Sequence, residues 1–199
     1  MRGGRSSEAQ PAPADGALAR VRIVLVRPRG AGNVGAAARA MMNCGVGELV
    51  LVRPRFRRLA AAERMAVHAR PLLQAARSVD DLAAAVADCH LVVGTSSRQG
   101  GYRSGADGLE SAAPELQRAA VGGRVAIVFG PEDHGLSNAD LRRCQRLVSI
   151  DTHPDYASLN LAQAVLLVCY ALYRASGVAA APAAPPAPPP APAAALDGL

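Results

Sequence analysis

The chain has 199 residues, of which half are hydrophobic but only 3% are aromatic, so its core must be built from Val, Leu, Ile and Ala. All 22 basic residues are arginine; they exceed the 16 acidic residues and give a pI near 9.8. This excess favours a polyanionic partner such as a nucleic acid. The four cysteines show no paired spacing, which argues against a disulfide framework or a metal site. Without a long apolar run or a secretory leader, we expect a cytoplasmic protein that binds neither membrane nor metal.

The two ends of the chain differ in composition from the middle. Residues 1–19 are rich in Ala, Gly, Pro and Ser, and residues 177–199 are almost wholly Ala and Pro. Neither segment has the apolar periodicity that offsets the entropy of ordering a chain, so we expect both to be disordered. The remaining residues, 20–176, are enough for one domain with a single core.

Short apolar runs alternate with amphipathic stretches along this domain. The expected strands are 21–26, 48–52, 90–94, 124–129 and 147–150. The expected helices are 34–43, about 59–68, 81–87, 112–120, 138–144 and 158–175. We expect Asn33, Asn138 and Ser158 to begin their helices, Gly45 to end the first one, and Pro114 to lie in a first turn. The alternation predicts an α/β domain with a mainly parallel sheet.

A glycine pattern after the first strand invites a dinucleotide-binding interpretation. Gly30, Gly32 and Gly35 fit the GxGxxG spacing and open a helix. However, residues 27–29 separate the first glycine from the strand, and the second strand is followed by Arg53 instead of an acid that would bind a ribose. An arginine suits a 2′-phosphate, so an NADP-binding oxidoreductase stays as an alternative.

Three further motifs point elsewhere. The first runs from 24 to 45 and contains the pattern Asn-x-Gly-x-x-x-Arg at 33–39; the second spans 129–137. The third consists of Ile150 and 158–165. In this order the three resemble the motifs of the SpoU/TrmH class of the SPOUT superfamily of RNA methyltransferases. Residues around 95–98 and 154–156 resemble its TrmJ-like branch in particular.

The resemblance implies a fold with a deep C-terminal trefoil knot, S-adenosylmethionine as cofactor, and a homodimer. It also implies transfer of a methyl group to a ribose 2′-hydroxyl, in a cytidine or uridine of a tRNA anticodon loop. Ribosomal RNA methylation and a non-catalytic RNA-binding role remain alternatives. One apolar face of the last helix is compatible with a dimer interface, although an ordinary core face would look the same: Leu161, Val165, Val168 and Leu172.

The catalytic residues that the resemblance implies are Arg39, Asn33, Glu132, Ser158 and Asn160. A hydroxyl is a weak nucleophile at neutral pH, but a guanidinium stays protonated and is a poor base. We therefore expect Arg39 to orient the hydroxyl and a phosphate, and we leave the proton acceptor open. Glu132 can accept a hydrogen bond from Arg39 or Asn33. Asn160 needs a polar partner within its apolar helix.

Two further sets of residues complete the expected site. The resemblance places cofactor contacts at Thr95, Ser96, Ser97, Gly130, Ile150, Ala157, Ser158 and Leu159. The expected RNA contacts are Arg29, Arg55, Arg57, Arg58, Arg98 and Arg103. Phe56 lies among these arginines and can stack on a base. Asp151 stands where the family usually has proline, which places an unexpected acid near the cofactor.

Overall fold

The computed structural model describes residues 16–56, 60–96 and 105–178. Within them, seven strands form one sheet in the order β3-β2-β1-β6-β4-β7-β5, and every pairing is parallel. The strands are β1 Val21–Val26, β2 Glu48–Val52, β3 Arg77–Val79, β4 Leu91–Thr95, β5 Asp107–Gly108, β6 Val125–Phe129 and β7 Arg146–Ser149. The five expected strands are confirmed to within one residue at each end. The short edge strands β3 and β5 were not predicted.

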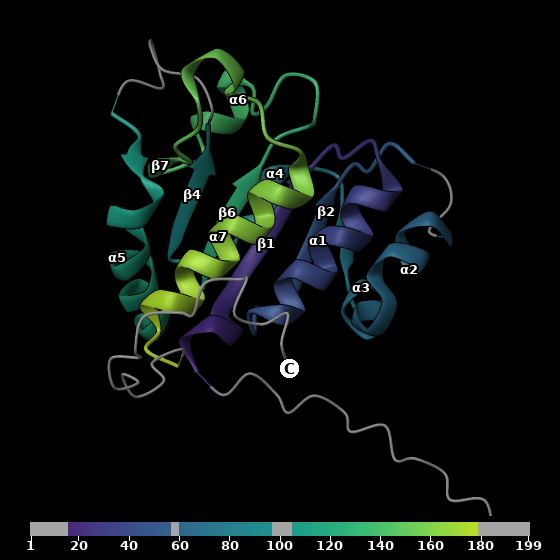
Figure 1. Ribbon diagram of the computed structural model, residues 1–199, viewed down its shortest axis with the longest axis horizontal. Coiled ribbons are helices and arrows are strands. Elements are labelled where there is room, and N and C mark those ends of the chain that lie inside the picture. The colour runs from purple at the N-terminus through teal and green to yellow at the C-terminus, as the bar shows by residue number, and fades with distance from the viewer. Residues whose placement is uncertain (1–15, 57–59, 97–104, 179–199) are drawn as a thin grey trace, which may run out of the picture.

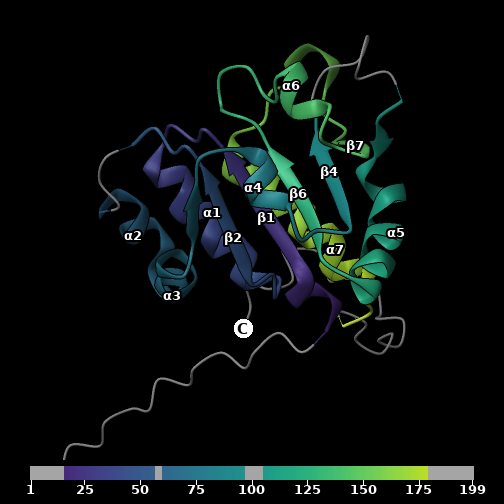
Figure 2. The same ribbon diagram turned by 180° about the vertical axis from the view of Figure 1, so that it is seen from behind.

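Helices cover both faces of the sheet (Figures 1 and 2). The α-helices are α1 Ala31–Asn43, α2 Ala60–Ala66, α3 Arg70–Gln74, α4 Leu82–Val86, α5 Leu109–Gly122, α6 Asn138–Leu141 and α7 Leu161–Ala175. Short 3-10 turns are η1 Ala17–Arg20, η2 Val67–Ala69 and η4 Pro154–Tyr156. Helices α1, α2, α3, α5 and α7 pack on one face, and α4 and α6 on the other.

The central strand β1 shows why its sequence is continuously apolar. All six of its residues are buried. Ile23 and Leu25 pack in the core beneath α1 and α7, whereas Val24 and Val26 pack in the core beneath α4 and α6. A parallel strand with helices on both faces has no solvent-facing side, so it has no polar alternation.

Helix α7 lies beside α1 on the same face of the sheet (Figure 1). The apolar face that we considered for a dimer interface is buried within this chain. Leu161 is 6% exposed, and Val165, Val168 and Leu172 are at most 1% exposed. These residues form core contacts, so this is an ordinary core face and not a dimer interface.

The three expected helix caps, Asn33, Asn138 and Ser158, do not cap their helices. Helix α1 begins at Ala31 after Gly30, which leaves Asn33 inside the first turn. Helix α6 is capped by Ser137, whose side chain forms a reciprocal capping box with Asp140. Helix α7 is capped by Asn160 and not by Ser158, because the Asn160 Oδ1 accepts a hydrogen bond from the Ala162 amide at 2.9 Å.

Other boundaries follow from burial and backbone geometry. Leu109 is buried and already belongs to α5, so Pro114 lies in the second turn instead of the first. Gly45 has φ 71° and ends α1 as expected, since the left-handed region favours glycine. Leu18 in η1 packs into the core, so the domain begins before residue 20. Most of the expected terminal segments, and residues 97–104, lie outside the described residues.

Candidate functional site

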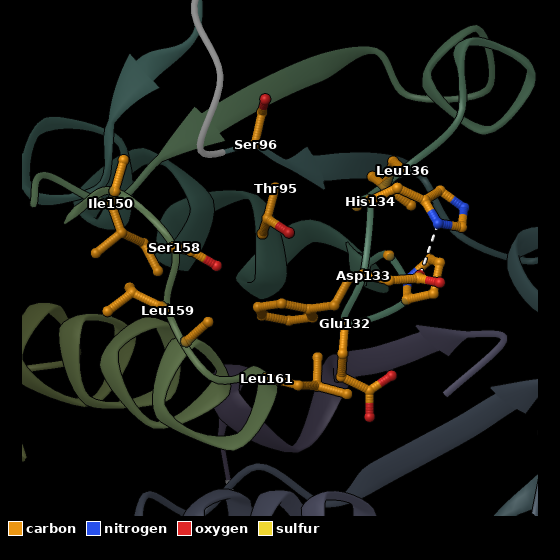
Figure 3. A pocket seen from close by; sticks show the side chains of 16 residues that line it. Thr95, Ser96, Glu132, Asp133, His134, Leu136, Ile150, Ser158, Leu159 and Leu161 are labelled. Atoms are coloured by element: carbon orange, nitrogen blue, oxygen red, sulfur yellow. Dashed lines mark ion pairs between the residues drawn. The ribbon is translucent and has the colours of Figure 1, made fainter. Parts of the chain in front are cut away.

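A pocket of about 350 Å³ lies beyond the carboxyl ends of β4, β6 and β7 (Figure 3). Its walls come from the loop after β6, the end of β4 and the segment that leads into α7. The lining residues are Thr95, Ser96, Phe129, Gly130, Pro131, Glu132, Asp133, His134, Gly135, Leu136, Ile150, Ala157, Ser158, Leu159, Leu161 and Ala164. In parallel sheets, ligands bind at this end of the strands. The volume is within the usual range for a small-molecule site.

The structure brings the expected cofactor residues together. Seven of the eight line this pocket, although they come from three separate parts of the sequence. The eighth, Ser97, lies outside the described residues. Thr95 donates its hydroxyl to the Val128 carbonyl at 3.0 Å, which fixes the end of β4 against β6. Asp151 is exposed and does not line the pocket.

The loop from Gly130 to Gly135 forms one wall of the pocket and closes on itself. A Cβ atom at Gly130 would lie 2.1 Å from the Gly135 carbonyl carbon and 2.2 Å from the Leu136 amide nitrogen. Gly135 itself has φ 69°, in the left-handed region. The missing side chain at Gly130 therefore lets the loop approach its own backbone.

A chain of side-chain hydrogen bonds joins the three sequence motifs. Asn33 donates its amide to Glu132 Oε1 at 3.0 Å, and Asn160 donates its amide to Asn33 Oδ1 at 3.1 Å. Asn160 then accepts from the Ala162 amide. This chain explains why polar residues stand at these three positions. It fixes the first turn of α1 against both the pocket loop and the start of α7.

Glu132 also binds the backbone in front of α1. Its carboxylate accepts from the amides of Arg29 and Gly30, both at 3.0 Å. Burial alone would raise the pKa of Glu132, but the hydrogen bonds from Asn33, Arg29 and Gly30 outweigh it and lower the pKa. Glu132 is therefore an ionised acceptor at the helix N-terminus, where negative charge is favoured. Of the two expected donors, Asn33 binds it and Arg39 does not.

Arg39 lies apart from the pocket that its own chain forms. It is exposed on the outer surface of α1, and its side chain forms no hydrogen bond or ion pair with the described residues. Ser158 does line the pocket and is exposed there. Thus Asn33, Glu132 and Asn160 form one connected group, Ser158 faces the pocket beside them, and Arg39 is separate.

The expected RNA-binding arginines are only partly described. Arg29 is exposed but already forms an ion pair with Asp133. Arg55 is exposed, and its backbone amide donates to the Pro28 carbonyl at 2.8 Å. Phe56 is half-buried and packs against the core, and its stacking on a base stays a prediction. The other four, Arg57, Arg58, Arg98 and Arg103, lie outside the described residues.

The sequence did not single out two polar residues at the pocket. Asp133 and His134 both line it, and His134 Nδ1 lies 2.6 Å from Asp133 Oδ1. Their position inside the second motif was the only sequence signal. Among the described residues, no group of three His, Cys, Asp or Glu side chains is placed to hold a metal ion. Within the same residues, no helix combines the length and apolarity needed to cross a membrane.

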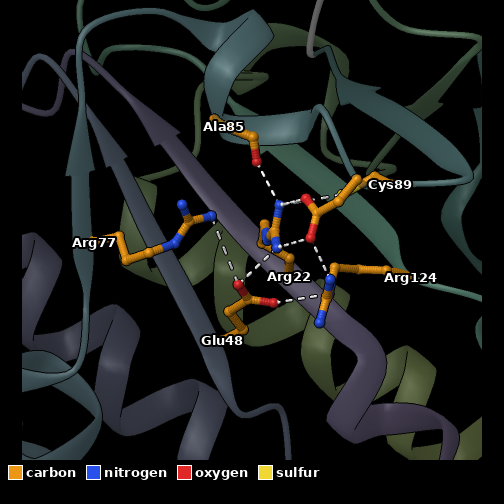
Figure 4. Close-up of polar contacts among 7 residues, drawn as sticks. Arg22, Glu48, Arg77, Ala85, Cys89 and Arg124 are labelled. Atoms are coloured by element: carbon orange, nitrogen blue, oxygen red, sulfur yellow. Dashed lines mark hydrogen bonds and ion pairs between the residues drawn. The ribbon is translucent and has the colours of Figure 1, made fainter.

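A second polar cluster lies at the opposite end of the central strands (Figure 4). Arg22 in β1 is 1% exposed, and its guanidinium lies 2.6 Å from Asp88 and 2.7 Å from Glu48. It also donates to the Ala85 carbonyl at 2.6 Å. Arg124 pairs with the same two carboxylates. A buried charge needs such partners, so this cluster holds β1, β2 and α4 together and lies away from the pocket.

The cluster predicts a dependence of stability on pH. Hydrogen bonds from Arg22 hold the pKa of Asp88 well below its ordinary value. A carboxyl with a lowered folded-state pKa stabilises the fold above the pKa of the unfolded chain, and this contribution is lost as the pH falls through the folded-state pKa. We expect Asp88→Asn to lower the free energy of unfolding at neutral pH, and the gap from the wild type to begin to narrow once the pH falls below about 4, the ordinary pKa of an aspartate. Urea titrations from neutral pH down to about pH 3 measure this gap.

The exposed Asp80 provides the matched control, because Asp80→Asn removes a carboxylate next to α4 without touching Arg22. This variant is expected to unfold like the wild type at neutral pH. Equal free energies of unfolding for Asp88→Asn and the wild type at neutral pH would show that the ion pairs of Asp88 do not stabilise the fold.

The chain matches the SpoU rRNA Methylase family over residues 20–170. It is 44% identical over 154 residues to the tRNA (cytidine/uridine/adenosine-2'-O-)-methyltransferase TrmJ of Pseudomonas aeruginosa, which covers 77% of this chain and 60% of that protein. The tRNA (cytidine-2'-O-)-methyltransferase TrmJ of Methanocaldococcus jannaschii is 38% identical, with 77% and 67% covered. The chain therefore spans between 60% and 67% of the length of these two curated relatives.

Solved structures agree with these matches. TrmJ from Z. mobilis ZM4 is 39% identical with a TM-score of 0.72, over 84% of this chain and 72% of that one. A probable methylase family protein from Haemophilus influenzae Rd KW20 is 40% identical with a TM-score of 0.76, over 81% and 68%. This likeness confirms the expected fold class, an α/β domain with the knotted SPOUT arrangement. The three motifs, which hydrogen bonds join beside the pocket, and these matches show that the chain belongs to the SpoU methylase family of the SPOUT superfamily.

Proposed function

We propose that this protein transfers a methyl group from S-adenosylmethionine to a ribose 2′-hydroxyl of tRNA. The observation that carries the proposal is the pocket, because residues of the second and third methyltransferase motifs line it and Asn33 of the first motif is hydrogen-bonded to Glu132 and Asn160. Relatives at 38–44% identity are named as tRNA 2'-O-methyltransferases. A 27% identical solved structure concerns 2-OH methylation of C/U34 on tRNA, which supports an anticodon-loop target. We place the reaction in the cytoplasm.

The pocket fits a nucleoside cofactor. Phe129, Ile150 and Leu159 provide apolar surface, while Thr95 and Ser158 provide hydroxyl groups at its walls. S-adenosylmethionine would supply an activated methyl group for the ribose oxygen and would leave as S-adenosylhomocysteine. The protein must hold the two reactants in line, since positioning accounts for much of the rate of such a transfer.

Arg39 is the expected residue for orienting the hydroxyl. Because it lies away from the pocket of its own chain, it could act only at the pocket of a second copy. It lies on the outer surface of α1, next to α7 on the same face of the sheet. The outer surface of α7 carries the exposed apolar residues Leu166, Leu167 and Tyr170, which are 40–50% exposed. Exposed apolar groups on one helix favour contact with a second protein surface. We propose that a second copy of the chain packs there and that Arg39 completes the partner's site.

The NADP-binding alternative has little support in the structure. In a dinucleotide-binding fold, the backbone amides before the first helix bind pyrophosphate. Here Glu132 occupies the amides of Arg29 and Gly30, so a carboxylate of the protein itself stands where a phosphate would bind. The pocket also lies beyond β4, β6 and β7 and not in front of the glycine pattern of α1.

Calorimetric titration with S-adenosylhomocysteine, with NADPH in parallel, tests the proposed cofactor. Binding of S-adenosylhomocysteine alone is the expected result, and binding of NADPH alone would contradict the proposal. The family description names rRNA whereas the relatives name tRNA, so ribosomal RNA is the second candidate substrate. Methylation assays with both purified RNAs distinguish them.

A further inference from the structure

A strained backbone position and a buried carboxylate meet behind the pocket loop. Arg27 follows β1 with φ 51°, in the left-handed region that residues with a Cβ atom avoid. Asp140 in α6 is only 8% exposed. Arg27 Nη2 donates to Asp140 Oδ2 at 2.6 Å. Each feature is unfavourable by itself, so their meeting in one contact indicates a role for that contact.

The left-handed backbone explains how Arg27 reaches Asp140. Side chains alternate along a strand, so a regular extension of β1 would turn Arg27 to the side of Leu25, beneath α1 and α7. Its partner lies on the other side, because Leu141 of α6 packs with Val24 and Val26. The turn at Arg27 therefore sends its side chain to α6. Its amide still donates to the Val52 carbonyl at 2.7 Å, so the pairing with β2 continues.

Asp140 transmits this contact to the pocket. The same Oδ2 atom accepts from the Ser137 amide at 3.0 Å and from the Ser137 hydroxyl at 2.6 Å. Ser137 directly follows Leu136, which lines the pocket. Burial would raise the pKa of Asp140, but its hydrogen bonds with Ser137 and Arg27 lower it, so the carboxylate is ionised. The far end of the loop is anchored by Glu132 to the Arg29 and Gly30 amides.

We propose that Arg27 is a positioning residue for the cofactor: its ion pair with Asp140 holds residues 130–137 in the shape that binds S-adenosylmethionine. The loop is then fixed at both ends to the segment 27–30 that leads into α1. This proposal rests on the proposed function, because it needs the pocket to be the cofactor site. It assigns a role to a residue that lies outside the Asn-x-Gly-x-x-x-Arg pattern of the first motif and outside the pocket lining.

The chain offers a matched control for the unusual backbone. Arg53 follows β2 with φ 46°, and its amide donates to the Val79 carbonyl at 3.0 Å, so its backbone repeats that of Arg27. Its side chain is exposed, and within the described residues it has no hydrogen bond or ion pair. Glycine accepts the left-handed conformation at both positions. Arg27→Gly and Arg53→Gly therefore remove one side chain each while keeping the turn.

Calorimetric titration of the full chain with S-adenosylhomocysteine tests the proposal. We expect Arg27→Gly to raise the Kd about tenfold, or about 1.4 kcal/mol, and Arg53→Gly to leave it unchanged. Arg27→Lys keeps a positive charge near Asp140 and should recover part of the loss. Wild-type affinity in Arg27→Gly would overturn the proposal and leave Arg27 as a turn residue only.

A double-mutant cycle separates the ion pair from a general loss of packing. Asp140→Asn preserves an acceptor for Ser137 but removes the charge that pairs with Arg27. If the two residues act through each other, the double variant should bind S-adenosylhomocysteine as tightly as whichever single variant binds it less tightly. Losses of binding free energy that add up in the double variant would contradict the proposal.

A readout without cofactor keeps this proposal distinct from the proposed function. Arg27→Gly should increase hydrogen exchange at the amides of Leu136 and Ser137, with no matching increase in Arg53→Gly. A wild type that binds no S-adenosylhomocysteine would refute the proposed function. Unchanged hydrogen exchange at these amides in Arg27→Gly would show that Arg27 does not anchor the loop, whichever cofactor the pocket binds.

Discussion

Arg39→Ala is expected to reduce methyl transfer by about 10²- to 10³-fold, the usual effect of removing one group that stabilises charge in a transition state. S-adenosylhomocysteine affinity should stay within twofold of the wild type, as an order-of-magnitude expectation, because Arg39 does not line the pocket of its own chain. Single-turnover kinetics with tRNA and calorimetry measure the two quantities separately. The matched control is Arg118→Ala, which removes an exposed arginine from α5. Weakened cofactor binding with normal turnover would contradict the assignment.

A mixing experiment shows whose pocket Arg39 serves. Ser158→Trp fills the pocket but leaves Arg39 intact, whereas Arg39→Ala leaves the pocket intact. If Arg39 acts across a dimer, the mixed dimer has one complete site, and random mixing should restore about a quarter of wild-type activity. If Arg39 acts within its own chain, no site in the mixed dimer is complete and the mixture stays inactive.

Gly35→Ala is expected to destabilise the protein by about 3 kcal/mol, at the upper end of the usual cost of overpacking. A Cβ atom at Gly35 would lie 2.0 Å from the Ala62 carbonyl oxygen and 2.8 Å from its Cα atom. These are backbone atoms of α2, so no side-chain rotation can relieve the clash and the two helices must separate. Urea unfolding at neutral pH measures the loss.

Gly122→Ala is the control for this substitution, since a Cβ atom there meets nothing within 4 Å. That variant should be neutral or more stable by up to about 1 kcal/mol, because alanine restricts the unfolded chain more than glycine does. Gly35→Ala with wild-type stability would mean that α1 and α2 do not pack as closely as the structure shows.

The strands were predictable from the sequence because a parallel strand between two helical layers is a short, continuous apolar run. Helix starts were harder, since tertiary contacts decide which of several polar residues caps a helix. Asn33 could cap α1, but its amide binds Glu132 instead. Ser158 could cap α7, but Asn160 does so while it also binds Asn33.

The candidate site was predictable to the extent that its motifs resemble a known family. That resemblance brought together the residues that line the pocket, although no local pattern shows that Thr95 and Ser158 meet. The sequence could not show that Gly35 packs against α2, or that Arg29 is paired with Asp133. It also could not place Arg39, because the exposed side of α1 depends on how α2 and α7 cover the others.

The most direct test of the proposed function is incubation of the purified protein with unmodified tRNA and S-adenosylmethionine that carries a labelled methyl group. After digestion to nucleosides, mass spectrometry identifies the modified product. We expect label in a 2′-O-methylated cytidine or uridine from the anticodon loop, with the rate of labelling at least about 10²-fold lower for Arg39→Ala. Label on a base, or no transfer to tRNA by a protein that binds S-adenosylhomocysteine, would contradict the assignment of this site to ribose methylation of tRNA.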